Sequence, residues 1–231
     1  MVDIRNKWAL ITGASRGVGK EVAKAMAQKG CNLIVHSRNT SSTDALAAEL
    51  SKSGITVHQL SAELEDVTQV RELGEKAQSL SGGLDILYNN AAIMTQYHTD
   101  IYGAKEDEFV QSFTINTIAP IILCNMIIPS MVKRGFGRVV NVTSGIQDQP
   151  QLMPYAASKA ALNKYVYDMA VHLEGSGVLM NLLDPGWLRT DLGGPKAPNA
   201  VESVIPGALV PVLLDDTTCG KFFCAQDYAE N

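Results

Sequence analysis

The stretch that decides the fold is Trp8-Ala9-Leu10-Ile11-Thr12-Gly13-Ala14-Ser15-Arg16-Gly17-Val18-Gly19. Its first five residues form an apolar run that is typical of a strand buried on both faces. Three glycines follow in the spacing G-x-x-x-G-x-G, and then a helical pattern begins, with Val22 and Met26 on its apolar side. Strand, glycine-rich turn and helix together predict a phosphate-binding entrance, because glycine lets the backbone approach a pyrophosphate and the helix N-terminus offers free N–H groups.

The rest of the chain repeats this alternation of short apolar runs and helical patterns. Further strands are predicted at residues 32–36, 55–60, 84–88, 138–142, 178–183 and 221–224, and further helices at 42–52, 67–80, 105–134 and 155–174. Such alternation indicates an α/β fold: one Rossmann domain over residues 1–231, with a doubly wound parallel sheet of about seven strands flanked by helices. In such a sheet, ligands bind at the carboxyl ends of the strands.

Composition narrows the classes of partner. The 231 residues carry a net charge of −5 without a block of like charges, so neither nucleic acid nor a membrane surface is an expected partner. The four cysteines and four histidines are scattered, so we expect no metal site and no disulfide framework. The N-terminus lacks a secretory pattern, and the apolar segment 118–132 is shorter than the about 20 residues of a membrane span. We therefore expect a cytoplasmic protein that binds a small molecule.

The end of the second predicted strand bears on the cofactor. An acidic residue here would bind the ribose 2′-hydroxyl of NAD, whereas a basic residue would bind the 2′-phosphate of NADP. The chain has no acid at this point and reads Ser37-Arg38-Asn39. Arg38, with Ser37 and with Arg16 of the glycine turn, can donate charge-assisted hydrogen bonds to a phosphate, which favours NADP(H) over NAD(H). The alternative is that Arg38 is an ordinary surface arginine.

Tyr155 and Lys159 lie four residues apart and therefore on one face of a predicted helix. A phenol ionises near pH ~10 and acts as a base only where a cation or a hydrogen-bond donor stabilises its anion, and Lys159 supplies a cation. Ser144 follows the strand 138–142, which should bring a hydroxyl to the same place. Together the three can polarise a carbonyl and move a proton, although tyrosine and lysine at this spacing are also common on a helix surface.

Assembled in order, these motifs resemble the short-chain dehydrogenase/reductase (SDR) family over nearly the whole chain. The residues that carry the resemblance are Thr12-Gly13-x-x-x-Gly17-x-Gly19, Asn89-Asn90-Ala91, Asn116, Ser144, Tyr155-x-x-x-Lys159 and Pro185-Gly186. The segment from Pro185 to Pro195 also looks like the C-factor-like and sniffer-like carbonyl reductases within that family.

The resemblance implies a hydride transfer between a nicotinamide and a carbonyl or secondary alcohol. Tyr155 would be the general acid in reduction and the general base in oxidation. Lys159 would lower the pKa of Tyr155 and hold the nicotinamide ribose. Ser144 would hydrogen-bond the substrate oxygen, and Asn116 would place a water that links Lys159 to solvent.

The resemblance also implies which residues bind the cofactor. Thr190 matches the position that binds the nicotinamide carboxamide, near the backbone of Leu188. The whole expected set is Gly13, Ser15, Arg16, Gly17, Val18, Gly19, Ser37, Arg38, Glu63, Leu64, Asn90, Ala91, Tyr155, Lys159, Pro185, Gly186, Leu188 and Thr190. An aspartate is common in the family where this chain has Glu63, so the adenine contact stays open.

Residues that follow or flank the motifs are expected to line an apolar substrate pocket. They are Met94, Ile146, Gln147, Met153, Trp187 and Leu192. Residues 190–205 contain a stretch rich in glycine and proline, and we expect them to form a lid over this pocket.

Two other functions are alternatives to a carbonyl oxidoreductase. A serine hydrolase with Ser144 as nucleophile would need G-x-S-x-G, but the chain reads Val142-Thr143-Ser144-Gly145-Ile146. A dinucleotide-binding sensor that had lost its chemistry is the second alternative.

Helices that carry residues 118–132 and 156–171 are expected dimer faces. We expect a homodimer, with a tetramer as the second arrangement, since the last strand lacks the family's paired glycines.

Overall fold

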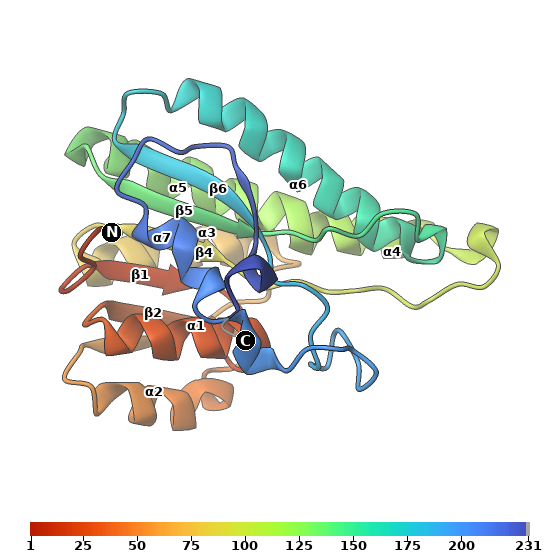
Figure 1. The fold of residues 1–231 in the computed structure, drawn as a ribbon, viewed down its shortest axis with the longest axis horizontal. Helices are drawn as coiled ribbons and strands as arrows, with labels where there is room; N and C mark the ends of the chain where they lie inside the picture. The colour runs from red at the N-terminus through yellow and green to blue at the C-terminus, as the bar shows by residue number, and fades with distance from the viewer. Residues whose placement is uncertain (230–231) are drawn as a thin grey trace.

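The chain, described over residues 1–229 by a computed structural model, forms one sheet of seven parallel strands in the order β3-β2-β1-β4-β5-β6-β7. Helices flank this sheet on both faces, as Figure 1 shows. The strands are β1 (Trp8–Ile11), β2 (Asn32–Ser37), β3 (Val57–Ser61), β4 (Ile86–Asn89), β5 (Gly137–Val142), β6 (Val178–Asp184) and β7 (Phe222–Cys224). The predicted Rossmann architecture is confirmed.

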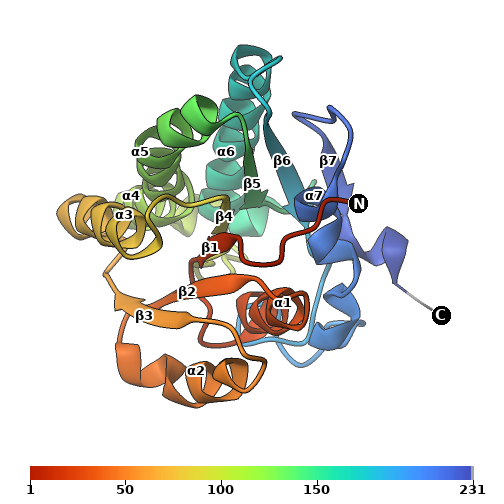
Figure 2. The ribbon, with the colours of Figure 1, turned by 90° about the vertical axis from the view of Figure 1, so that its left-hand side faces the viewer.

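Two hydrophobic cores lie on opposite faces of the sheet. The end-on view in Figure 2 shows the helices on each face. The first core is covered by α1 (Gly17–Gln28), α2 (Asp44–Ser51) and α7 (Val210–Leu213). The helices on the second face are α3 (Val67–Ser81), α4 (Glu106–Phe113), α5 (Ala119–Arg134) and α6 (Met153–His172). Strands with helices on both faces read as continuous apolar runs, which is why the sequence pattern found them.

Local sequence explains where several helices begin and end. The Asp66 carboxylate accepts hydrogen bonds from the N–H groups of Thr68 and Gln69 and so caps α3. Gly82 and Gly135 end α3 and α5 in the left-handed conformation, with φ of 66° and 68°. The predicted helix 42–52 starts later, at α2, because residues Thr40–Thr43 form a 3₁₀ turn that Asn39 caps.

The strand order places the ligand edge. β1 lies between β2 and β4, where Leu10 is in register with Ile34 on one side and with Leu87 on the other. The strand order therefore reverses at β1, and in open α/β sheets ligands bind beyond the carboxyl ends of the strands at such a point. The loops that follow β4 and β6 extend past the carboxyl ends of the strands in Figure 1.

A single helical rod, Glu106–Arg134, joins α4 to α5 through a π-helical turn, Thr114–Ile118. The helix predicted over 105–134 is thus continuous but contains a wide turn, and Pro120 sits in the first turn of α5, where proline is tolerated. Among the described residues this rod is the helix with the length and hydropathy of a membrane span, but most of its apolar stretch is buried inside the protein.

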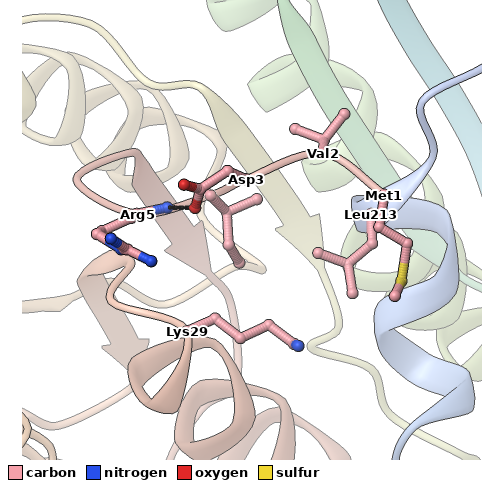
Figure 3. Close-up of a pocket in the computed structure, with 7 residues that line it drawn as sticks. Met1, Val2, Asp3, Arg5, Lys29 and Leu213 are labelled. Atoms are coloured by element: carbon pink, nitrogen blue, oxygen red, sulfur yellow. Dashed lines mark hydrogen bonds between the residues drawn. The ribbon is translucent and has the colours of Figure 1, made fainter.

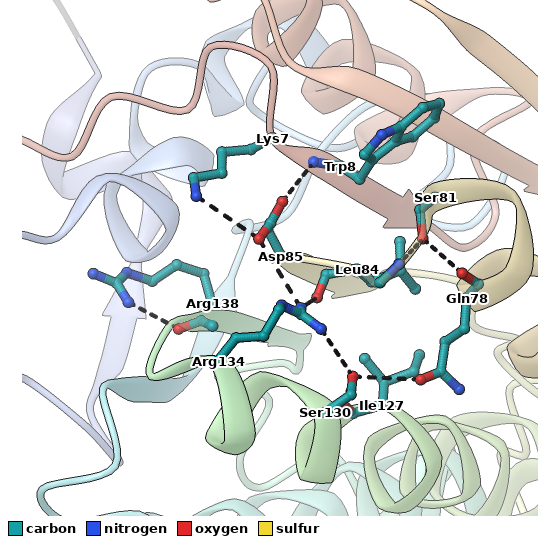
Figure 4. Close-up of polar contacts among 12 residues, drawn as sticks. Lys7, Trp8, Gln78, Ser81, Leu84, Asp85, Ile127, Ser130, Arg134 and Arg138 are labelled. Carbon is teal, nitrogen blue, oxygen red and sulfur yellow. Dashed lines mark hydrogen bonds and ion pairs between the residues drawn. The ribbon is translucent and has the colours of Figure 1, made fainter.

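The amino ends of the central strands are closed by a charge network, which Figure 4 shows. The Asp85 carboxylate accepts a hydrogen bond from the Trp8 N–H at 3.0 Å and lies 3.8 Å from Lys7 Nζ and 4.0 Å from Arg134 Nη2. Arg134 also donates to the Leu84 carbonyl. The buried Arg138 guanidinium donates to three carbonyls, those of Gly137, Gly177 and Leu214. These contacts join the starts of neighbouring strands.

Candidate active site

The glycine turn after β1 has the shape that the sequence predicted. Gly13 and Gly17 have φ of 66° and 59°, which only glycine adopts without strain. A Cβ on Gly13 would lie 2.8 Å from Ala91 Cα, and one on Gly19 would lie 2.5 Å from both Asn90 Nδ2 and the Gly13 oxygen. The three glycines therefore let the turn, the start of α1 and the end of β4 lie against one another.

Hydrogen bonds of the Asn90 and Thr12 side chains hold this turn against the end of β4. The Asn90 amide donates to the carbonyls of Thr12 and Gly13 at 2.9 and 3.1 Å. The Thr12 hydroxyl accepts from the N–H groups of Asn90 and Ala91 at 3.0 and 3.1 Å. The Asn90 side chain, predicted to bind cofactor, thus bonds to the turn itself.

His36, at the end of β2, is a residue of the site that sequence reasoning missed. Its Nδ1 accepts a hydrogen bond from the Gly13 N–H at 3.3 Å, and its Nε2 donates to the Ala62 carbonyl at 3.1 Å. These two bonds select the neutral tautomer with the proton on Nε2. Burial lowers the pKa of His36 to about 4. A lone histidine in an apolar strand gives no sequence signal for this link between the glycine turn and β3.

The predicted phosphate-binding residues lie on the same side of the turn but are differently engaged. Arg38 is exposed, and the buried Ser37 hydroxyl donates to the Asn39 carbonyl at 2.6 Å. Arg16 Nη1 lies 2.8 Å from the carboxylate of Asp191, in the loop after β6. Both members of this pair are about 70 % exposed, with values of 69 % and 71 %, so the pair contributes little to stability.

Other predicted cofactor residues are spread around the turn. Ser15 and Val18 are half-buried, and Val18 packs on the first core. The Glu63 N–H donates to the Gln69 side chain, whereas the Leu64 side chain lies in the second core. Leu64 can therefore offer a ligand only its backbone.

Tyr155 and Lys159 are brought together on the first turns of α6, and both are buried. Lys159 Nζ lies 5.9 Å from the centre of the Tyr155 ring and donates to the Val142 carbonyl at 2.8 Å. Burial lowers the pKa of Lys159 to about 8. The strand β5 thus fixes the ammonium group beside the phenol, as the spacing of the two residues predicted.

The pKa of Tyr155 departs from the sequence-based expectation. Burial raises the pKa of Tyr155 to about 12, the Ser144 side chain lowers it, and the Asp184 carboxylate raises it further. The lowering expected from Lys159 is not found: the pKa of Tyr155 moves upward, because burial disfavours the phenolate. In this structure the phenol is held protonated at neutral pH.

Ser144 reaches the same point from the loop after β5. It is half-buried, and its Oγ accepts a hydrogen bond from the Ile146 N–H at 3.2 Å. The Ser144 side chain lowers the pKa of Tyr155, so the two side chains lie close together. The predicted group of Ser144, Tyr155 and Lys159 therefore shares one position at the carboxyl edge of the sheet.

Asn116 lies on the π-helical turn, fully buried. Its amide accepts from the Ile93 N–H and donates to the Ile93 carbonyl, both at 2.9 Å, and also donates to the Ser158 hydroxyl at 3.0 Å. Ser158 in turn donates to the Tyr155 carbonyl at 2.7 Å. The side chain thus ties the loop after β4 to the helix that carries Tyr155.

The predicted cofactor and pocket residues after β6 lie in one loop. Thr190 faces Gly17, since a Cβ on that glycine would lie 3.6 Å from Thr190 Cγ2. Pro185 and Gly186 form the turn that leads into the loop, and Leu188 is buried. Trp187 Nε1 donates to the Gly193 carbonyl at 2.7 Å. Arg189 closes the loop by donating to the carbonyls of Ala197 and Pro198.

Most of the predicted pocket residues are open to solvent. Four of them are exposed apolar side chains: Met94, Met153, Trp187 and Leu192. The polar side chain of Gln147 is also exposed, whereas Ile146 is half-buried. The structure does not gather these six around an enclosed cavity. They leave an apolar surface at the loops of the carboxyl edge.

Two hollows in the described part of the chain lie elsewhere. One, of about 220 Å³, is shown in Figure 3 and lies between the N-terminal segment, Lys29 and Leu213. The other, of about 240 Å³, is lined by Tyr167, Val171 and Cys219 among others. Neither contains the grouped Ser144, Tyr155 and Lys159, so the chemistry of these residues locates the site better than surface shape does.

Comparison with known proteins agrees with this geometry. The family model for short chain dehydrogenase matches residues 7–200. Dehydrogenase/reductase SDR family member 4 of Homo sapiens is 32 % identical over 189 residues, which are 81 % of this chain and 68 % of the relative.

Two solved structures with bound cofactor have the same fold. One is a 3-oxoacyl (acyl-carrier-protein) reductase from Agrobacterium tumefaciens C58 with NADP bound, at a TM-score of 0.86 and 25 % identity over 96 % of this chain and 93 % of that one. The other is a blue fluorescent protein from a metagenomic library in complex with NADPH, at 0.86 and 26 % over 96 % and 97 %. The chain is therefore an oxidoreductase that belongs to the short-chain dehydrogenase/reductase family.

Proposed function

We propose that this oxidoreductase uses NADP(H) to interconvert a carbonyl compound and its secondary alcohol, as a carbonyl reductase does. The observation that carries the proposal is the meeting of Ser144, Tyr155 and Lys159 at the carboxyl edge, beside the glycine turn. A bound nicotinamide supplies the hydride. Tyr155, a buried phenol that is protonated at neutral pH, supplies the proton that reduction requires.

The residues around α1 fit a dinucleotide. The N-cap residue Arg16 makes no side-chain hydrogen bond to the start of α1, and no acidic residue lies in its first turn. Its first N–H groups are thus available to a phosphate, and the helix dipole favours an anion there. The glycines keep Cβ atoms out of this cradle. Arg38 and Arg16 add positive charge where a 2′-phosphate would lie.

Each catalytic group then has a task that its contacts support. Ser144 donates to the substrate oxygen, and Tyr155 transfers the proton to it. Lys159, fixed by the Val142 carbonyl, holds the ribose and stabilises the phenolate left by proton transfer. Asn116 keeps the helix of Tyr155 and the loop after β4 aligned, and a water beside it completes the proton path to solvent.

A substrate screen tests this function. NADPH and NADH consumption are measured with a panel of ketones and aldehydes, and NADP⁺ reduction with the matching alcohols. We expect turnover with NADPH for apolar carbonyl compounds. Tight NADPH binding without any turnover would instead favour a dinucleotide sensor on the same fold.

Residues 190–205 form the proposed lid of the single domain. The Arg16–Asp191 pair joins this segment to the glycine turn, and a phosphate on Arg16 would compete with Asp191. Protection of residues 190–205 from hydrogen exchange should therefore change when NADPH binds. Identical exchange with and without NADPH would remove the lid from the proposal.

We also propose a cytoplasmic homodimer that acts on a small molecule and binds neither nucleic acid nor membrane. Exposed apolar residues support these helices as the contact faces: Ile118 directly before α5, Val132 on α5, and Tyr167 and Val171 on α6. Sedimentation velocity distinguishes the homodimer from a monomer and from a tetramer. Cell fractionation tests the location.

A further inference from the structure

Asp184 is a carboxylate of the active-site edge to which the catalytic scheme above gives no task. It is the last residue of β6 and pairs in register with Cys224 of β7, while its neighbour Leu183 is in register with Val142 of β5. Its position therefore lies directly beside the loop that carries Ser144. The strand order makes this placement independent of any flexible loop.

The two carboxylate oxygens of Asp184 have different surroundings. Oδ1 accepts a hydrogen bond from the Gly186 N–H at 3.0 Å, which shapes the turn after β6. A Cβ on Gly145 would lie only 2.6 Å from Oδ2, so Oδ2 packs against the residue that follows Ser144. Within residues 1–229, Oδ2 makes no hydrogen bond, so its charge is not neutralised by a direct partner.

The charge of Asp184 reaches the catalytic hydroxyl. The ionisable groups that face this point are Tyr155 and Lys159 from α6, Asp184 from β6 and Cys224 from β7. Asp184 raises the pKa of Tyr155, after the larger effect of burial. It also raises the pKa of Cys224, again after burial. A negative charge that acts on the phenol also acts on a substrate whose carbonyl contacts that phenol, with a strength set by the distance between the charges.

We propose that Asp184 selects substrates by charge: its carboxylate beside Ser144 and Tyr155 disfavours carbonyl compounds that carry an anionic group next to the reacting carbon. The inference rests on the proposed carbonyl chemistry and names its substrate class as uncharged or cationic carbonyl compounds. Asp184 is a positioning residue, because it acts on substrate and proton donor through its field rather than by contact.

The test compares phenylglyoxylate with its methyl ester, which have the same ketone and differ by one negative charge. Calorimetry measures the dissociation constants of the two compounds from the enzyme–NADPH complex. Reduction rates are measured for each compound that is turned over. The variant is Asp184→Asn, whose side-chain oxygen can still accept from the Gly186 N–H. Asp184→Ser, which retains an acceptor in a shorter side chain, serves if the first variant does not fold. Asp227→Asn, at an exposed carboxylate near Cys224, is the matched control.

We expect the wild type to bind the ester more tightly, and Asp184→Asn to narrow the ratio of the two dissociation constants about tenfold, because the variant removes one charge–charge repulsion. In alcohol oxidation, which needs the phenolate, the same variant should move the pH at half-maximal rate down, because Asp184 raises the pKa of Tyr155. Asp227→Asn should change neither. An unchanged ratio and pH profile in Asp184→Asn would overturn the inference. The binding comparison does not require turnover. An enzyme that binds both compounds but reduces neither would therefore contradict the proposed function and leave the inference about Asp184 to be decided by the binding ratio.

Discussion

The two edges of the sheet use their polar residues in opposite ways. At the amino edge, charged groups bond to one another and to backbone carbonyls: Asp85 joins Lys7 and Arg134, and Arg138 donates to three carbonyls. At the carboxyl edge, the side chains of Ser144 and Tyr155 lie close together beside a glycine turn and an uncapped helix. The hydrogen bonds and ion pairs of the polar side chains therefore distinguish the amino edge, which stabilises the fold, from the carboxyl edge, which carries the candidate active site.

The difference has an energetic reason. Hydrogen bonds among the groups of the amino edge stabilise the fold, since a buried polar atom without a partner costs about 1–3 kcal/mol. At the carboxyl edge, burial instead displaces ionisation equilibria: it raises the pKa of Tyr155 and lowers those of Lys159 and His36. The shifts of Tyr155 and Lys159 are typical of a reactive site, whereas that of His36 belongs to a buried structural group.

The largest expected effect comes from removing the proton donor at the carboxyl edge. Tyr155→Phe should lower kcat by about 10³-fold, because general acid catalysis typically contributes ~10²–10⁴-fold, while the dissociation constant of NADPH should stay close to that of the wild type. Steady-state kinetics and NADPH fluorescence titration measure both quantities. Tyr165→Phe, on the same helix with its hydroxyl bonded to Asn125, is the control and should remain active. Substantial activity in Tyr155→Phe would place the proton donor elsewhere.

The next effect concerns His36, which lies at the carboxyl edge but, like the charged groups of the amino edge, bonds to backbone groups. His36 is neutral when folded, with a pKa lowered from 6.5 to about 4, so the unfolded chain binds more protons between these values. The free energy of unfolding should therefore fall by about 3 kcal/mol as the pH drops from 6.5 to 4. Denaturant titrations at pH 6.5, 5.5 and 5 follow this loss. In His36→Asn the pH dependence should be flatter, and equal slopes in both proteins would assign the loss to other groups.

Specificity for the cofactor is the third test of the reactive edge. Arg38→Asp should weaken NADPH binding by about 10–100-fold, the value of one charge-assisted hydrogen bond, and leave NADH binding nearly unchanged. Fluorescence titration with each cofactor gives the ratio. Arg71→Asp, an exposed arginine on α3, controls for a general change of charge. Equal weakening of both cofactors would show that Arg38 does not contact the 2′-phosphate.

The smallest effect is expected at the amino edge. Asp85→Asn keeps an acceptor for the Trp8 N–H but removes the attraction to Lys7 and Arg134, so stability should fall by about 1 kcal/mol. Thermal unfolding measures the loss, and kcat/KM should stay at the wild-type value. A change of activity beyond twofold would mean that the two edges are coupled.

Periodic and local features of the fold were predictable. Apolar runs located every strand within two residues, and the i, i+4 spacing of Tyr155 and Lys159 placed both on one face of α6. The glycine turn was recognisable because its residues are contiguous and close packing there excludes Cβ atoms. These features depend on neighbours in the sequence, which a pattern can record.

Long-range polar contacts were not predictable. The bonds of His36 to Gly13 and Ala62, and the pairing of Arg16 with Asp191, join residues that share no periodicity. The sign of the pKa shift of Tyr155 depends on how deeply the phenol is buried, which spacing cannot reveal. No sequence pattern singles out Asp184, and only the sheet register places it beside the loop of Ser144.

The π-helical turn at Thr114–Ile118 has a consequence for the geometry of the whole rod. A π turn contains one residue more than an α turn, and each residue rotates an α-helix by about 100°. Deleting one residue there would restore a uniform helix but rotate α5 relative to α4, which would carry Leu123 and Ile127 away from the second core. The extra residue thus acts as an angular offset: one rod can point the Asn116 amide at the helix of Tyr155 and still present its apolar side to the sheet.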